Sequence, residues 1–220
     1  MQTVLTYLTI FFTALVMQAQ TDTITENTNT ATTKYQQGMQ KAFQLWKEDK
    51  PLEAANVFER IALAEPDNWL PPYYAAQIKV IYGFTEKDKT KLTAQLEKAQ
   101  NFINDATAIS KENPDLLVLQ AQLYTVWIVF DGQQYGMQYS GKASELYNKA
   151  LALAPNNPNM ILAKAEWDMG GAKYFGQSVE PYCKDIQRAI DLFATFKPAG
   201  EFYPSFGKER AKQVQKEYCN

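Results

Sequence analysis

Apolar residues recur at helical spacing along most of the chain, and the clearest stretch ends at Pro155. Five of them fall at positions i, i+3, i+4, i+7 and i+8, which places them on one face of a helix. These five are Ala143, Leu146, Tyr147, Ala150 and Leu151. Proline donates no backbone N–H and restricts the residue before it, so Pro155 ends the helix. The pattern predicts an amphipathic helix over about 141–154.

Asparagine followed closely by proline marks the starts of three more helices. An asparagine side chain accepts hydrogen bonds from the free N–H groups of a first turn, where proline is tolerated. The three asparagines are Asn68, Asn113 and Asn157. They predict helices over about 69–83, 114–130 and 158–169, each the first helix of a pair.

Further helices are expected between and around these. One helix begins near Lys34, and Pro51 opens its partner, which runs to about Ala64. The remaining second helices are expected over about 85–110, 141–154 and 179–196, opened by Thr85 with Asp88, by Ser140 and by Ser178. A polar helix over about 208–218 follows near the end of the chain.

Two second helices share one spacing of alanine, aromatic residue and proline. The residues are Ala54, Phe58 and Pro66, and then Ala143, Tyr147 and Pro155. This spacing resembles the second half of a tetratricopeptide repeat (TPR). The resemblance covers about 34–198 and implies an all-α fold, a TPR-like right-handed α-solenoid of about four extended helix pairs with a C-terminal capping helix. Such arrays are scaffolds whose first helices line a concave groove for a peptide or a partner helix.

The first residues are typical of an export signal followed by a polar leader. Val4–Met17 is apolar apart from three threonines, and small and polar residues follow it. We expect a signal peptide over 1–19, a disordered Thr/Asn-rich leader over 20–33 and a folded domain over 34–220. The protein would then be periplasmic or secreted, without a stable membrane span; the alternatives are an uncleaved anchor and a mis-set start codon. With the tail Pro204–Glu209, this start resembles small exported TPR proteins of Gram-negative bacteria, whose function is generally unassigned.

Composition narrows the chemistry. The net charge of −2 gives no positive field for nucleic acid. The chain has no histidine, which removes the commonest general base and the commonest nitrogen ligand of zinc. We therefore expect no metal, no cofactor and no catalytic residue. Cys183 and Cys219 form either a disulfide, which suits an oxidising compartment, or two thiols.

Two sets of residues are candidates for contact with a partner. The groove candidates, on predicted first helices, are Tyr73, Tyr74, Gln77, Tyr124, Trp127, Glu166 and Trp167. The second set comes from two glycine-rich stretches that join a first helix to a second, and comprises Tyr135, Tyr139, Tyr174 and Phe175. The stretches hold the same place in successive pairs, so we expect them on one edge as a contact surface. The alternative is that these rings cover helix ends.

These features favour a non-catalytic protein- or peptide-binding scaffold in the bacterial envelope, which uses a concave helical groove. One alternative is a self-associating structural protein, a homodimer formed through the edge of the array. Another is a hydrolase of envelope polymers, which requires two carboxylates that converge across a cleft, at least one with a raised pKa. The sequence shows no such pair.

Overall fold

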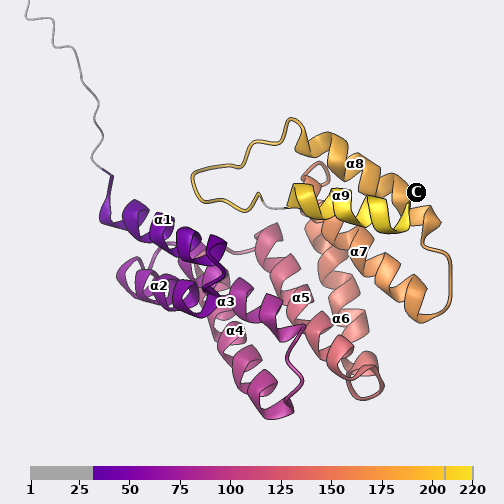
Figure 1. The fold of residues 1–220 in the computed structure, drawn as a ribbon, viewed down its shortest axis with the longest axis horizontal. Helices are drawn as coiled ribbons and strands as arrows, with labels where there is room; N and C mark the ends of the chain where they lie inside the picture. The colour runs from indigo at the N-terminus through magenta and orange to yellow at the C-terminus, as the bar shows by residue number, and fades with distance from the viewer. Residues whose placement is uncertain (1–31, 206, 220) are drawn as a thin grey trace, which may run out of the picture. The chain divides into compact units, whose positions relative to one another are not determined.

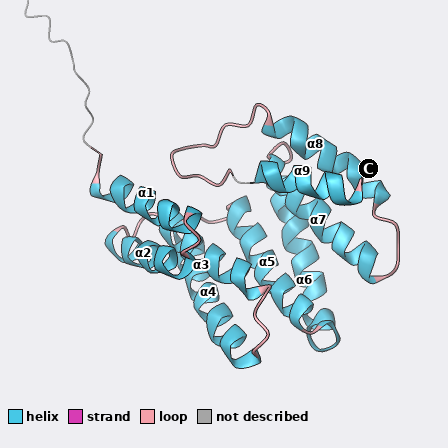
Figure 2. Ribbon diagram, in the orientation of Figure 1, coloured by secondary structure: helices cyan, strands magenta, loops and turns pink. Residues whose placement is uncertain are grey.

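Consecutive helices make up the described part of the protein, residues 32–205 and 207–219, in this computed structural model (Figures 1 and 2). Within these residues the chain forms no strand. The helices are α1 (Lys34–Lys47), α2 (Pro51–Ala64), α3 (Leu70–Gly83), α4 (Lys89–Ile109), α5 (Pro114–Phe130), α6 (Gly132–Leu153), α7 (Pro158–Tyr174), a 3-10 turn η1 (Glu180–Tyr182), α8 (Cys183–Phe193) and α9 (Gly207–Tyr218). The predicted signal peptide, 1–19, and nearly all of the leader, 20–33, lie outside the described residues.

The helices pack stepwise along the chain. Each α-helix from α1 to α8 contacts the next α-helix in the sequence. First helices of successive pairs are also in contact, α3 with α5 and α5 with α7. This pattern of near-neighbour contacts defines a solenoid of helix pairs. The all-α, TPR-like solenoid expected from the sequence is confirmed. In the described part of the chain, no helix combines the length and apolar character that crossing a bilayer requires.

Asparagine side chains accept from the first turns of three first helices, as predicted; Asn113 and Asn157 are the N-cap residues of α5 and α7, whereas Trp69 holds that position before α3. The side-chain oxygen of Asn68 accepts from the Leu70 N–H at 3.1 Å, and that of Asn113 accepts from Asp115 N–H at 2.9 Å. Asn157 does the same for the N–H of Asn159 at 3.0 Å. Each bond satisfies a first-turn N–H that has no partner within the helix.

Helix α6 begins nine residues earlier than the sequence predicts, and Ser140 is not its cap. The helix starts at Gly132, and Asp131 Oδ1 accepts from the Gln134 N–H at 3.0 Å. The predicted glycine-rich linker over 131–141 is therefore almost entirely helical. Its aromatic rings pack on α5, and this tertiary contact outweighs the low helix propensity of glycine.

Three other boundaries also differ from the prediction. Helix α4 is capped by Asp88 alone, whose Oδ1 accepts from Lys91 N–H at 3.0 Å. Helix α7 continues through Gly170 and Gly171 to Tyr174. Helix α8 is shorter than predicted because η1 precedes it, and Ser178 Oγ accepts from Glu180 N–H at 3.2 Å.

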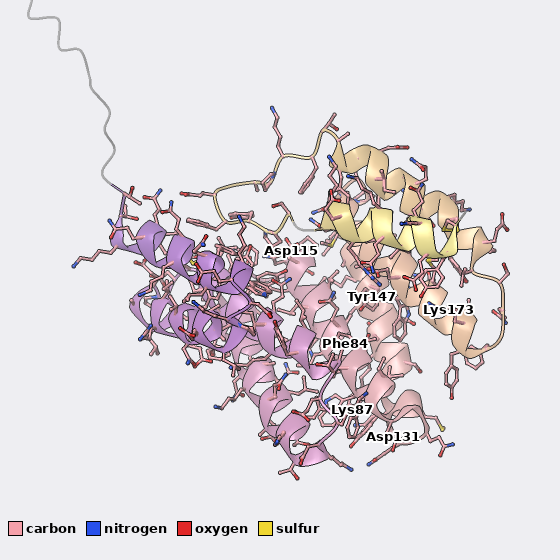
Figure 3. All side chains as sticks on the ribbon, in the orientation of Figure 1. Phe84, Lys87, Asp115, Asp131, Tyr147 and Lys173 are labelled. Atoms are coloured by element: carbon pink, nitrogen blue, oxygen red, sulfur yellow. A yellow bond between two sulfur atoms is a disulfide. The ribbon has the colours of Figure 1, made fainter. Side chains whose placement is uncertain are left out.

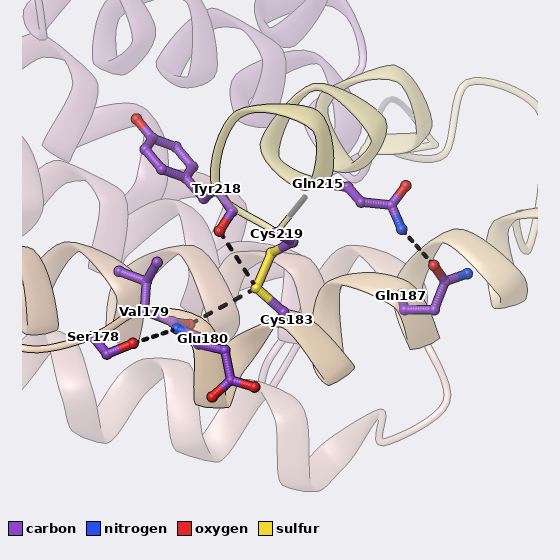
Figure 4. The surroundings of a disulfide bond; sticks show 8 residues. All are labelled: Ser178, Val179, Glu180, Cys183, Gln187, Gln215, Tyr218 and Cys219. Carbon is purple, nitrogen blue, oxygen red and sulfur yellow. Dashed lines mark hydrogen bonds between the residues drawn. A yellow bond between two sulfur atoms is a disulfide. The ribbon is translucent and has the colours of Figure 1, made fainter.

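The polar helix α9 closes the C-terminal end of the array. Its Ala211 and Val214 are buried in the same apolar cluster as Ile186 and Phe193 of α8. A disulfide joins Cys183, at the start of α8, to Cys219, just after α9, with 5.5 Å between the Cα atoms (Figure 4). The pairing that the sequence left open is formed, and the predicted capping helix is confirmed.

Candidate binding surfaces

The segment between α8 and α9 leaves the C-terminal helices, runs to α1 and returns (Figure 1). We call residues 199–205 of this segment the strap. The ring of Phe202 stacks on Phe43 of α1, with 5.8 Å between centroids, and meets the edge of Tyr35 at 5.8 Å. Tyr203 packs edge-to-face on Trp69 at 5.5 Å. The strap therefore lies against α1 and the start of α3.

Polar contacts fix the strap at three points. Tyr74 Oη donates to the carbonyl oxygen of Phe202 at 2.5 Å, and Asn159 Nδ2 donates to that of Pro204 at 3.3 Å. Gln36 Nε2 donates to Glu201 Oε2 at 2.8 Å. All these partners come from α1, α3 and α7, which are first helices of pairs. We call the face that these first helices form the inner face, and the strap lies on it.

The predicted groove residues of α3 and α7 contact the protein itself. Tyr74 is 0% exposed and Tyr73 is also buried. Gln77 Nε2 donates to Tyr73 Oη at 3.1 Å, while Gln77 Oε1 is buried without a hydrogen-bond partner among the described residues. Trp167 and Glu166 have internal partners too: Trp167 Nε1 donates to Ser144 Oγ at 2.9 Å, and Glu166 pairs with Arg210 of α9 at 2.7 Å. In this structure each of these side chains therefore makes contacts within the fold.

Two carboxyl groups on the first helices are desolvated. Burial raises the pKa of Asp115, in the first turn of α5, to about 6. Burial also raises the pKa of Glu166, and the neighbouring Arg210 guanidinium opposes that effect. Neither residue lines the cavity of about 240 Å³ beside Phe84 or the one of about 470 Å³ between α4, α5 and α6. Among the described residues no three histidine, cysteine or acidic side chains are grouped to hold a metal ion.

A second surface lies where first helices turn into second helices. It carries large apolar side chains that face solvent, which we call the turn edge: Phe84, Val129, Met137, Tyr174 and Phe175. Met137 is 98% exposed and Phe175 is 73% exposed. Figure 3 shows Phe84, Lys87 and Asp131 together at this end of the helices, away from Asp115.

Contacts between successive turns make the turn edge continuous. Phe84 and Val129 line the same cavity of about 240 Å³, between the ends of α3 and α5. Lys89 Nζ, at the start of α4, lies 3.3 Å from Gln134 Oε1, at the start of α6. The ring of Tyr174, at the end of α7, lies against Gly132. A Cβ atom placed on this glycine would lie 3.8 Å from Cε2 of the Tyr174 ring. Three consecutive pairs thus contribute to one surface.

The remaining predicted contact residues form a ladder of rings between α5 and α6. Tyr124 stacks on Tyr139 with 4.9 Å between centroids, and Trp127 packs on Tyr135 at 4.8 Å. All four rings are half-buried. Lys89 Nζ lies 5.8 Å from the Tyr135 ring centre, and Lys142 Nζ lies 5.7 Å from that of Tyr139. The rings of α6 thus pack on the side of α5.

Tyr174 and Phe175 behave differently, because they pack edge-to-face on each other at 5.1 Å and remain exposed. Sequence reasoning missed Phe84 and Val129 as members of the same surface, and it missed the strap. A signal for Phe84 and Val129 was present: each is an apolar residue at the end of a helix, close to a turn, where polar residues are the rule.

Comparisons with known proteins bear on the fold. No family model matches the chain, and no curated protein matches it. Among solved structures, the HusA haemophore from Porphyromonas gingivalis is similar, with a TM-score of 0.73 and 19% identity, over 84% of this chain and 92% of that one. A thermophilic TPR protein of Thermus thermophilus has a TM-score of 0.39 and 15% identity, over 84% of this chain and 97% of that one. The stepwise helix pairs and the likeness to the haemophore structure establish that the chain has the fold of an all-α, TPR-like solenoid.

Proposed function

We propose that the chain is a non-catalytic binding protein of the bacterial envelope, which holds a protein partner at the turn edge. The observation that carries the proposal is the set of exposed apolar side chains at three successive turns, where Phe84 and Val129 line one cavity and Tyr174 lies against Gly132. Large exposed apolar patches mark interaction sites in soluble proteins. The envelope location rests on the signal-like start and agrees with a disulfide, which persists in oxidising compartments.

The chemistry of the turn edge suits a protein partner. Tyrosine, phenylalanine and methionine are enriched at the centres of interfaces. The acidic side chains beside them are engaged by backbone amides: Asp88 and Asp131 cap helices, and Glu86 Oε1 accepts from the N–H of Lys87 at 2.8 Å. These carboxylates remain charged, so side chains of both signs, including Lys87 and Lys89, surround the apolar residues.

Site-specific photo-crosslinking tests the turn edge. A photoreactive residue replaces Met137, Phe175 or, as the control, Leu63, an 85% exposed residue on α2. We expect Met137 and Phe175 to crosslink to one and the same envelope protein and Leu63 not to do so. The purified partner should then bind a Tyr174→Ser/Phe175→Ser variant at least about tenfold more weakly, because two interface anchors are lost.

Two outcomes would count against this function. Equal crosslinking from Leu63 would mean that exposure alone, and not the turn edge, determines capture. Crosslinks only between copies of the chain, with a dimer mass by light scattering, would favour the self-associating alternative. An unchanged melting temperature of the double variant is the required control, because both side chains are exposed and contribute little to stability.

Haem is a second candidate ligand, favoured by the ring ladder and by the likeness to a structure described as a haemophore. Haem is a flat aromatic dianion, and the ladder offers ring faces with Lys89 and Lys142 beside Tyr135 and Tyr139. Titration with haemin should quench the fluorescence of Trp127 at a 1:1 ratio and shift the haemin absorbance. Tyr135→Ala should weaken binding about tenfold, whereas Leu52→Ala, on α2, should not. Equal affinity of both variants would exclude the ladder as the haem site.

A further inference from the structure

The strap is held in the manner of a bound peptide. Two side chains of the helices donate hydrogen bonds to its main chain. Tyr74 Oη donates to the carbonyl oxygen of Phe202, and Asn159 Nδ2 donates to that of Pro204. Two aromatic rings contact its side chains. Phe202 stacks on Phe43 of α1, and Tyr203 packs edge-to-face on Trp69, the residue that precedes α3. Donors to main-chain carbonyls bind a segment irrespective of its side chains, and aromatic slots select those side chains.

The strap is also separable from the helices. It belongs to no helix, so its departure would break no helical hydrogen bond. The preceding residues Ala194 and Thr195 and the stretch 197–199 are exposed and form a lead into it. Phe202 has a φ of 64°, a left-handed backbone conformation that is unfavourable for a phenylalanine. The contacts of its ring and carbonyl hold it in that conformation.

The disulfide makes the strap part of a closed ring. Cys183 and Cys219 are separated by 36 residues, and the strap lies between them. While the bond is intact, it holds α9, which follows the strap, to α8, which precedes it (Figure 4). The strap can leave the inner face without releasing the C-terminal helix, so its local concentration remains high and its return is favoured.

We propose that the strap is the resident occupant of a peptide site on the inner face, and that a partner segment carrying an aromatic pair followed by proline takes its place. The site consists of the donors Tyr74 and Asn159 and the ring slots of Phe43 and Trp69. The residues Phe202, Tyr203 and Pro204 show which peptide chemistry it accepts. This site is separate from the turn edge, so the test of one does not decide the other.

A peptide with the sequence of residues 198–205, blocked at both ends, tests the site. Phe202→Ala/Tyr203→Ala removes both rings of the strap and leaves the ring slots empty. We expect this variant to bind the labelled peptide at least about tenfold more tightly than the unaltered protein does, measured by fluorescence anisotropy, because the resident competitor is weakened. The control peptide has alanine in place of its phenylalanine and tyrosine, and the control protein carries Tyr174→Ala/Phe175→Ala.

A second measurement needs no variant. Excess peptide added to the unaltered protein should raise hydrogen exchange of the strap amides, at residues 199–205, as the strap is displaced. The proposal is overturned if the folded double variant binds the true and the control peptide equally. It is also overturned if peptide leaves strap exchange unchanged. Should the double variant fail to fold, the exchange experiment decides alone.

Discussion

Asp115 carries a carboxyl group whose burial in the fold disfavours its charged form. Its carboxyl group is desolvated, and the pKa is raised from 3.8 to about 6. It lies near Tyr73 and Tyr74, whose own pKa values burial raises. Because the folded protein binds the proton of Asp115 more tightly than the unfolded chain does, the ionised group destabilises the fold at neutral pH. The first turn of α5 offsets part of this cost, since a helix N-terminus favours a negative charge.

Asp115→Asn should therefore stabilise the protein at pH 7 by about 1–2 kcal/mol. The gain should shrink as pH falls from about 6 towards about 4, because the folded wild-type group becomes protonated through that window, and it should vanish below it. Urea unfolding at several pH values across that window and above it measures the gain. Asp67→Asn, at an exposed turn residue, is the control. A gain independent of pH would contradict the assignment to burial.

Helix α6 shows how tertiary contacts decide the extent of an element. Gly132, Gly136 and Gly141 are poor helix formers, and the sequence alone favours a loop there. In the structure Tyr135 and Tyr139 pack on α5, and the helix extends far enough to place them. Asp131 then supplies the cap that a helix start requires.

Asp131→Ala should lower the free energy of unfolding by about 1 kcal/mol, because the first-turn N–H of Gln134 loses its acceptor. Hydrogen exchange should rise over residues 132–140 and remain unchanged in α4. Asp131→Asn preserves an acceptor and should retain most of the stability, and Asp105→Ala, at an exposed position of α4, should have little effect. If Asp131→Asn lost as much stability as Asp131→Ala, charge rather than capping would be responsible.

At the scale of the whole molecule, the C-terminal third performs two tasks. Helix α9 buries Ala211 and Val214 against α7 and α8 and so covers the last pair, as a solenoid end requires. The strap crosses to α1 and α3 and ties the first pairs to the last. The disulfide joins the start of α8 to the end of α9 and closes this part into one covalent ring. The strap thereby covers part of the inner face, and the turn edge is left as an exposed apolar surface.

The sequence by itself determined the helices, their pairing and the asparagine caps of α5 and α7. Those features depend on apolar periodicity and on hydrogen bonds between neighbours, such as that of Asn113 with the second residue after it. Tertiary structure alone decided that Tyr74 is buried, that α6 begins at Gly132, that the cysteines pair and that the strap lies on the inner face. The bond from Tyr74 to Phe202 spans 128 residues, and no local pattern in the sequence encodes a contact at that separation.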